Sequence, residues 1–191
     1  MPFDSARTAL LAMDCQAGIV SIYAREGGLI ERAAGVVQAA RKAGIAVVHV
    51  QVGFRPGLPE VSRRNKLFAA IKDNPQHQKL FSGEAGAIHP ALGPDPADIV
   101  ITKHRVSAFK GTDLEMILRA KEIETLVLFG IATSGVVLST LVEAGDADFN
   151  VVVISDCCAD LDPELHTALL TRLYPRRAEV TTAEDFLKAI Q

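Results

Sequence analysis

The sequence predicts a three-layer α/β/α fold built on a six-stranded, mostly parallel, doubly wound sheet. The first indication is a series of short segments that are nearly continuous in Val, Ile and Leu, as expected for parallel strands buried on both faces. The second is that segments with helical periodicity lie between them, which favours right-handed βαβ crossovers. The third is the length of 191 residues, enough for one packed core but short of two ordinary domains. We therefore expect residues 1–191 to form a single domain.

Each expected element follows from its own pattern. Strands are short aliphatic runs, and helices are longer runs with apolar residues three or four positions apart. The expected strands are residues 8–13, 45–50, 98–102, 125–129, 150–154 and, more weakly, 178–181. The expected helices are residues 29–43, 113–120, 133–144, 163–174 and 183–190.

The stretch 51–97 departs from this alternation. Gly, Pro, Asn and charged residues cluster in it, around at most one short helix near residues 64–71. A long insertion of this kind is usually functional or disordered. In an open parallel sheet, ligands bind beyond the carboxyl ends of the strands, so the residues just after each strand are the first candidates for a site.

Composition favours a protein that binds small molecules. The net charge is −3 and the charges of both signs are interspersed, which predicts no nucleic-acid partner and no polybasic membrane anchor. The apolar segment that ends at Met13 is too short for a signal peptide or a membrane span. We expect a cytoplasmic protein whose partners are a small-molecule substrate and further copies of itself.

The three cysteines, Cys15, Cys157 and Cys158, are expected to be structural. Adjacent cysteines rarely bridge each other, and the count is odd, so no disulfide framework is predicted. Cys15 follows Asp14 and should point to the opposite face of the sheet. The other two are expected in a turn, where small residues serve packing. Free cysteine is among the most buried residue types.

Polar side chains follow the expected strands at the presumed ligand edge. They are Asp14, Gln51, Lys103 with His104, Thr133 with Ser134, and Asp156. Asp14 and Lys103 could share a site in which Asp14 moves protons and Lys103 stabilises negative charge, since partial burial tunes both groups. From the residues alone, a simple salt bridge at the rim is an equally good interpretation.

A longer motif extends this reading. Residues 103–114 read KHRVSAFKGTDL and resemble the signature K-x-x-x-S-A-F-x-G-T-x-L of the isochorismatase-like hydrolases. Before it, Asp14-Cys15-Gln16 is similar to the opening D-x-Q of that family. After it, residues 130–137, GIATSGVV, are similar to its G-x-x-T-x-x-C-V turn. The resemblance covers nearly the whole chain and implies a Rossmann-like α/β/α hydrolase.

The resemblance also implies catalytic residues, with one departure. In that family an Asp, a Lys and a Cys form the catalytic triad. The first two correspond to Asp14 and Lys103, but Val136 stands at the position of the cysteine. A valine cannot attack a carbonyl, so thioester chemistry of the kind used by nicotinamidases and N-carbamoyl amidohydrolases is disfavoured.

True isochorismatases also lack the cysteine and hydrolyse a vinyl ether by protonation and capture of the cation by water. On that analogy Asp14 is the general acid, and Lys103 orients it or holds a substrate carboxylate. The family's non-proline cis peptide is expected near residues 131–132. A general acid must hold its proton, but a nearby Lys lowers the pKa of an Asp. Desolvation of Asp14 or binding of the substrate therefore has to raise this pKa by more than Lys103 lowers it.

For substrate binding we expect contributions from the strand ends, the insertion and the signature. Arginine forks suit carboxylates, so the substrate is expected to be a small anionic metabolite. Arg63 and Arg64 are candidates for this role as well, although a position as solvated helix residues is slightly favoured, and Tyr23, in a loop over residues 18–28, is left open. The candidate binding residues are Gln51, Phe54, Arg55, Phe109, Ala132, Thr133 and Ser134.

No metal or cofactor is expected. Zinc-binding relatives carry an Asp-x-His pair beyond the second strand, whereas residues 49–54 read HVQVGF without an acid. His77 and His89 are isolated in the sequence, which is typical of surface or capping residues. There is no Gly-x-Gly-x-x-Gly after the first strand and no P-loop.

Two other functions stay open at this point. The chain could be an amide hydrolase that uses another nucleophile, such as Ser134 or a cysteine, or a binding protein on an inactive hydrolase scaffold. The apolar helices 133–144 and 163–174, together with the oligomeric habit of the resembled family, imply self-association as a dimer or a larger even-numbered assembly.

Overall fold

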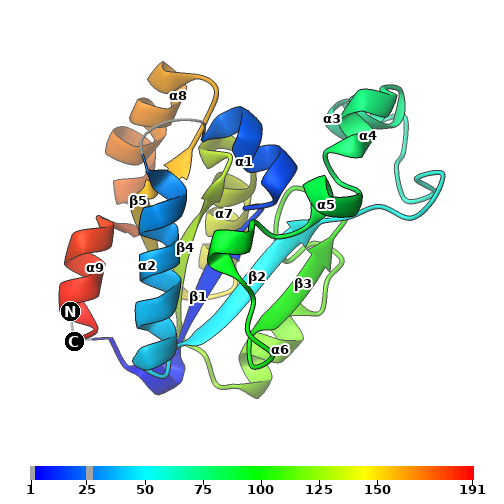
Figure 1. The fold of residues 1–191 in the computed structure, drawn as a ribbon. Coiled ribbons are helices and arrows are strands. Elements are labelled where there is room, and N and C mark those ends of the chain that lie inside the picture. The colour runs from blue at the N-terminus through cyan, green and yellow to red at the C-terminus, as the bar shows by residue number, and fades with distance from the viewer. Residues whose placement is uncertain (1–2, 25–27) are drawn as a thin grey trace.

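The computed structural model describes residues 3–24 and 28–191 and has the expected three layers (Figure 1). Six strands form one sheet in the order β3-β2-β1-β4-β5-β6, and all neighbouring strands are parallel. The chain builds outward from β1 in one direction and from β4 in the other, so the strand order reverses between these two strands. The strands are β1 Thr8–Met13, β2 Ala46–Val52, β3 Ile99–Lys103, β4 Thr125–Ile131, β5 Asn150–Ala159 and β6 Glu179–Thr181.

Helices cover both faces of the sheet. In the view of Figure 1, α2 and α9 pack side by side in front of it and α7 lies behind it. Helix α2 shows why these segments are helical: its buried residues, among them Ile30, Ala33 and Val37, recur every three or four positions. The described helices are α1 Ala17–Tyr23, α2 Leu29–Lys42, α3 Lys66–Lys72, α4 Pro75–Lys79, α5 Gly83–Gly86, α6 Leu114–Ala120, α7 Leu138–Asp146, α8 Pro163–Ala168 and α9 Ala183–Ala189.

The insertion 51–97 is more helical than the sequence predicted. It contains α3, α4 and α5 where at most one short helix was expected. Local caps explain the extra turns. The Asn65 side chain accepts a hydrogen bond from the Phe68 N–H at the start of α3, and the Asn74 side chain accepts one from the Gln76 N–H at the start of α4. Polar residues that suggested a loop are therefore helix caps.

The expected loop over residues 18–28 is also wrong in its first part, because α1 occupies residues 17–23; residues 25–27 lie outside the described part of the chain. Gly18, which suggested a loop, sits inside this helix. A Cβ atom there would lie 2.9 Å from the Leu80 carbonyl oxygen. The glycine thus permits close packing of α1 against the end of the insertion.

Strand β5 is longer than expected. It was predicted to end at residue 154, with the two adjacent cysteines in a turn, but it continues to Ala159. Its pairing with β4 shifts from Leu128 opposite Val153 to Gly130 opposite Cys158. The additional residues of β5 form an irregularity after which parallel pairing resumes. Asp156 and Cys157, which were expected to follow the strand, belong to this irregularity.

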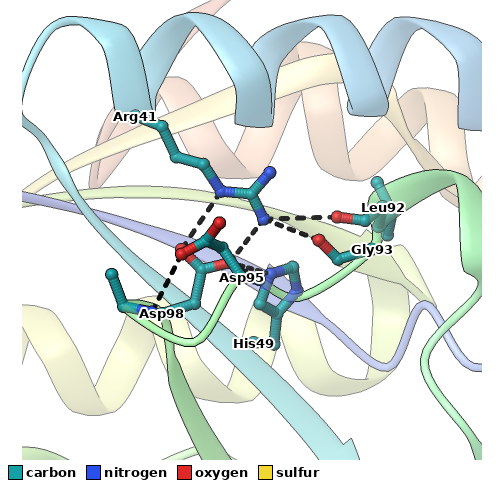
Figure 2. A network of polar contacts seen from close by, with 7 residues as sticks. Arg41, His49, Leu92, Gly93, Asp95 and Asp98 are labelled. Carbon is teal, nitrogen blue, oxygen red and sulfur yellow. Dashed lines mark hydrogen bonds and ion pairs between the residues drawn. The ribbon is translucent and has the colours of Figure 1, made fainter.

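A buried polar network fixes the chain just before β3 (Figure 2). Arg41 of α2 binds the Asp98 carboxylate and the carbonyl oxygen of Gly93. The Nε2 atom of His49, on β2, lies 3.0 Å from Asp98 Oδ2. The Asp95 N–H donates to the same carboxylate oxygen. Three elements are therefore tied together at the start of β3, the strand that ends at Lys103.

A search for membrane-crossing segments over residues 3–24 and 28–191 found no helix with the length and apolarity to span a bilayer.

Candidate active site

Asp14 and Lys103 meet at the carboxyl edge of the sheet. Lys103 Nζ lies 2.9 Å from Asp14 Oδ2, and both side chains are buried, with exposed fractions of 2% for Lys103 and 8% for Asp14. Asp14 immediately follows β1 and has a left-handed backbone, with φ of 54°, a conformation in which Asp is enriched among non-glycine residues. Lys103 ends β3 and donates a second hydrogen bond, to the Arg105 carbonyl oxygen, at 2.9 Å. The two residues therefore form one buried ion pair.

Burial decides the proton affinity of Asp14. Desolvation raises the pKa of its carboxyl above the usual value and outweighs the charge and hydrogen bond of Lys103, which lower it. Its second oxygen, Oδ1, is buried and has no hydrogen-bond partner among the described residues. A protonated carboxyl in this position has a proton that it can donate to a bound molecule.

The turn after β4 lies beside this pair. The Ile131-Ala132 peptide bond is cis, at the position that the family resemblance implied. Residues Thr133–Val137 then form a π-helical turn before α7. The glycine that precedes the cis bond has a packing reason: a Cβ atom on Gly130 would lie 2.1 Å from the Met13 carbonyl oxygen. Close contact between the ends of β1 and β4 thus brings the turn next to Asp14.

Buried hydrogen bonds hold the turn in place. The Thr133 hydroxyl lies 3.2 Å from the Ala159 carbonyl oxygen and 2.8 Å from His166 Nδ1. The Tyr174 hydroxyl donates to the Thr133 carbonyl oxygen at 2.6 Å. Val136, 2% exposed, is presented by this turn.

A pocket of about 600 Å³ opens at this edge of the sheet. Asp14, Lys103 and Val136 line it together with apolar side chains from α1, α3 and the segment around α4. Its lining consists of Asp14, Ile19, Ile22, Tyr23, Val52, Leu67, Phe68, Ile71, His77, Leu80, Phe81, Lys103, Val106, Ile131, Ala132, Ser134, Gly135, Val136, Asp160 and Leu161. A partly apolar small molecule fits such a lining.

Of the seven residues expected to bind substrate, Ala132 and Ser134 line this pocket. The structure places the others outside its lining. Gln51 donates to the Thr102 hydroxyl at 3.1 Å. Because side chains alternate along a strand, the neighbouring Val52 faces the pocket instead. Thr133, the first residue of the turn, is buried and makes the contacts given above.

The two phenylalanines and the arginine of that set have packing or surface contacts. Phe54 packs edge-on against Phe68 and Phe81, both of which line the pocket, so it supports the wall from behind. Phe109 is buried against Phe149, at a ring distance of 6.0 Å. The Arg55 side chain is 65% exposed and lies near Glu60 and His104.

All three cysteines are buried, and none lines the pocket. Burial raises the pKa of the Cys15 thiol well above its usual value, and the neighbouring Asp14 carboxylate raises it further. Burial likewise raises the pKa of Cys157, and that of Cys158 to about 12. These thiols lack the thiolate character that a nucleophile or metal ligand needs.

Sequence reasoning missed Asp160, which follows β5 and lines the pocket. The signal was available, since Asp160 comes six residues after the expected end of the fifth strand, but the irregular extension of β5 was not anticipated. It also missed the apolar residues of α1 and α3 as pocket walls, and His77, interpreted from the sequence as a surface or capping residue, lines the pocket as well. Tyr23, left open from the sequence, is part of the same lining. Across residues 3–24 and 28–191, no group of three or more His, Cys, Asp or Glu side chains is placed to hold a metal ion.

Comparison with known proteins gives a consistent result. Residues 8–185 match the isochorismatase domain family. The uncharacterized isochorismatase family protein YecD of Escherichia coli is 34% identical over 197 residues, covering 100% of both chains. Ureidoacrylate amidohydrolase RutB of Methylorubrum extorquens is 35% identical over 185 residues, covering 84% of this chain and 73% of the relative. An isochorismatase family protein from Burkholderia thailandensis has a similar structure, with a TM-score of 0.86, 34% identity and coverage of 100% and 98%.

Proposed function

The chain belongs to the isochorismatase family of hydrolases, and we propose that it hydrolyses its substrate by general acid catalysis from Asp14, with water as the nucleophile and without a cysteine or a cofactor. The observation that carries the proposal is the Asp14 carboxyl itself. It lines the pocket, is buried beside Lys103, and has one oxygen without a hydrogen-bond partner in the described part of the chain. Val136, at the position where the family pattern has a cysteine, lines the same pocket.

Asp14 can act as the acid only if it keeps its proton, although the Lys103 ammonium beside it lowers its pKa. The raised pKa of Asp14, in which burial outweighs the lysine, supports this requirement. Lys103 then has a positioning role, because its hydrogen bond to Oδ2 orients the carboxyl. An acid that is both oriented and partly desolvated is suited to protonating a weakly basic group.

The reaction that suits this arrangement is hydrolysis of a vinyl ether. Asp14 donates its proton to the terminal carbon of the enol ether, and the resulting cation is captured by water. The hemiketal then breaks down to an alcohol and a ketone. No acyl group is transferred to the protein, so a valine at position 136 is compatible with each step.

We further propose a small substrate with an apolar body and one anionic group. The apolar wall suits the body. The Lys103 ammonium has three donors, of which two bind Asp14 and the Arg105 carbonyl oxygen. The third can bind a substrate carboxylate. The arginines considered from the sequence are absent from the pocket lining.

Amide hydrolysis is a second candidate, favoured by the identity to ureidoacrylate amidohydrolases and by the position of Ser134 in the pocket lining. In this case the Ser134 hydroxyl would attack the carbonyl and an acyl-enzyme would form. The Ser134 side chain bonds the Asp160 carboxylate and no His or Lys among the described residues, and a carboxylate whose pKa is lowered is too weak a base to activate a serine hydroxyl. We therefore rank this candidate second.

A substrate panel separates the two. It contains isochorismate, α-methoxystyrene as an apolar vinyl ether, nicotinamide, N-carbamoyl amino acids, ureidoacrylate and short amides. We expect turnover of a vinyl ether with no mass increase on the protein during turnover. Turnover restricted to amides, with an acyl adduct mapped to Ser134 or a cysteine, would overturn the proposal in favour of the second candidate. Ligand binding without any turnover would identify a binding protein instead.

A further inference from the structure

Asp160 places a second carboxylate in the pocket. It follows the last residue of β5, and hydrogen bonds fix its carboxylate on two sides. Oδ2 accepts the Ser134 N–H at 2.7 Å, and Oδ1 accepts the Leu161 N–H at 2.9 Å. Its orientation is therefore set by the same turn that presents Val136. We infer that Asp160 is the general base of this site, which binds the attacking water and accepts its proton; the inference rests on the proposed function.

The strand order places the two carboxylates on opposite sides of the turn. Asp14 follows β1, Asp160 follows β5, and the turn after β4 lies between them. Neighbouring strands are about 4.8 Å apart, so the axes of β1 and β5 are separated by roughly 10 Å. Glycoside hydrolases that place both a scissile bond and a water between an acid and a base have carboxyl separations of about 6.5–9.5 Å. Because both carboxylates line one pocket and β4 separates their strands, the space between them suits a substrate and a water.

Hydrogen bonding leaves Asp160 able to take part. Besides the two amide contacts given above, the Ser134 side chain and the Asp162 N–H also bond this carboxylate, so the attacking water binds in the place of the Ser134 hydroxyl, which can rotate away. Burial raises the pKa of Asp160, but the hydrogen bonds from Ser134, Asp162 and Leu161 outweigh it and hold the pKa below its usual value. The pKa of Asp14 is shifted in the opposite direction. Two carboxyls with opposite shifts in one pocket match the roles of acid and base.

The proton balance follows from these roles. Asp14 gives its proton to the terminal carbon of the vinyl ether, which becomes a methyl group. Water adds to the cationic carbon as its proton passes to Asp160. The hemiketal hydroxyl then loses its proton as the carbonyl forms, and the leaving alkoxide oxygen gains one. After product release Asp160 returns its proton to solvent and Asp14 takes one up. The net reaction consumes one water and yields one alcohol and one ketone.

The competing interpretation is that Asp160 only holds the Ser134 N–H and so shapes the turn. Asp160→Asn separates the two roles, because the amide oxygen still accepts the Ser134 N–H but cannot accept a proton. The amide NH2 then replaces the acceptor of the exposed Leu161 N–H, and the Tm of the variant measures the cost of that loss. Asp162→Asn is the matched control. Asp162 lies in the same loop, outside the pocket lining, and caps α8 by accepting the Glu164 and Leu165 N–H groups through Oδ1. Asn caps helices as well as Asp.

The experiment measures kcat and KM between pH 5 and pH 9 for wild type and for the Asp160→Asn, Asp160→Ala, Asp162→Asn and Asp14→Asn variants. The probes are isochorismate, followed by pyruvate release, and α-methoxystyrene, followed by acetophenone release. We expect Asp160→Asn to lower kcat roughly 100-fold or more across this range and to change KM little. Asp162→Asn should stay within about twofold of wild type. Formate should restore part of the activity of Asp160→Ala, since it supplies a small carboxylate.

The outcomes are distinct. If Asp14→Asn is inactive while Asp160→Asn keeps wild-type kcat, this inference is wrong and the proposed function stands. If Asp160→Asn loses activity only in proportion to a lower Tm, or formate has no effect on Asp160→Ala, the residue is structural and the inference is again wrong. If neither vinyl ether is hydrolysed, or Asp14→Asn remains active, the proposed function is overturned and the inference falls with it.

Discussion

Lys103 reaches across β2 to place its Nζ atom 2.9 Å from the Asp14 carboxylate, although the strands that carry the two residues are not neighbours. The contact is buried, so it differs from the salt bridge at the rim that the sequence alone allowed equally well. A buried ion pair is held in one geometry and is screened little by salt. The proton affinity of Asp14 is consequently set by the protein and not by the medium.

Asp14→Asn is expected to lower kcat roughly 100-fold or more, because the amide cannot donate a proton to carbon. The variant should still fold and lose at most about 1–3 kcal/mol of unfolding free energy, since the amide oxygen can still accept the Lys103 hydrogen bond. Turnover and urea unfolding test the two effects separately. Asp156→Asn is the control, because Asp156 lies on the same edge but outside the pocket lining. A fully active Asp14→Asn variant would exclude the general acid.

Lys103→Met should shift the pH profile in a direction that a merely structural lysine would not produce. Lys103 lowers the pKa of Asp14, so its removal raises that pKa further. Asp14 then stays protonated to higher pH, so the basic limb of the kcat profile should move to higher pH. The maximal kcat should fall, because the carboxyl is no longer oriented. The position of the limb, measured from pH 5 to pH 10, is the readout. A limb that moves downward contradicts the assignment of Asp14 as the acid.

The network around His49 predicts how stability depends on pH. His49 is 1% exposed, its Nε2 faces Asp98, and its Nδ1 is buried without a partner in the described residues. Burial therefore lowers the pKa of His49, in spite of Asp98. The unfolded chain binds a proton near pH 6.5 that the folded protein does not, so stability falls as pH drops below that value, by at most about 1.4 kcal/mol per pH unit for one proton.

His49→Gln removes this titration and keeps an N–H donor toward Asp98. Urea unfolding of wild type and variant at pH 8, 6.5 and 5 should show a smaller loss of stability for the variant. The other histidines are common to both proteins and cancel in the comparison. Asp98 adds a loss at lower pH, because its hydrogen bonds to Arg41, Asp95 and His49 hold its pKa below the usual value in spite of burial. Parallel pH curves for the two proteins would contradict this account.

The sequence predicted the sheet well because its strands are aliphatic on both faces, which leaves few alternatives for β1, β2 and β4. It predicted the meeting of Asp14 and Lys103 because the carboxyl ends of parallel strands share one edge. It did not predict which face each strand-end side chain uses. Gln51 and Val52 are adjacent in sequence, yet only Val52 lines the pocket, since one residue of register reverses the face.

Motif membership was likewise a poor guide to ligand contact. Phe109 belongs to the signature, yet it packs in the core. Its neighbour Ala108 donates its N–H to the Thr140 hydroxyl, and Thr112 bonds back to the Ala108 carbonyl oxygen. These contacts tie the segment after β3 to α7. Asp160 was missed for the converse reason: it belongs to no quoted motif, and only the irregular path of β5 brings it to the pocket.

Self-association remains our prediction, and we propose an even-numbered assembly that uses the region around α8. Leu161 and Leu165 are large apolar side chains that are 60% and 42% exposed there. Leu161 also lines the pocket. Sedimentation at micromolar concentration should give a dimer or tetramer, and Leu165→Glu should shift it toward monomer. Glu115→Lys, a charge change on the exposed face of α6, is the control. A wild-type monomer under these conditions would contradict the prediction.

The choice of chemistry depends on Val136, and thiol labelling tests it directly. The native cysteines are buried and their pKa values are raised, so iodoacetamide should leave wild-type turnover and mass unchanged. Val136→Cys changes the side-chain volume little and places a thiol in the pocket near Lys103, whose charge favours the thiolate. We expect this variant to be alkylated at one site and inactivated. Val137→Cys is the matched control, because Val137 is fully buried and does not line the pocket, so its thiol should resist the reagent in the folded protein. Alkylation of wild type at Cys15, Cys157 or Cys158 with parallel loss of turnover would instead revive a cysteine nucleophile, because a thiol essential for turnover is incompatible with a mechanism in which water attacks and the protein forms no covalent intermediate.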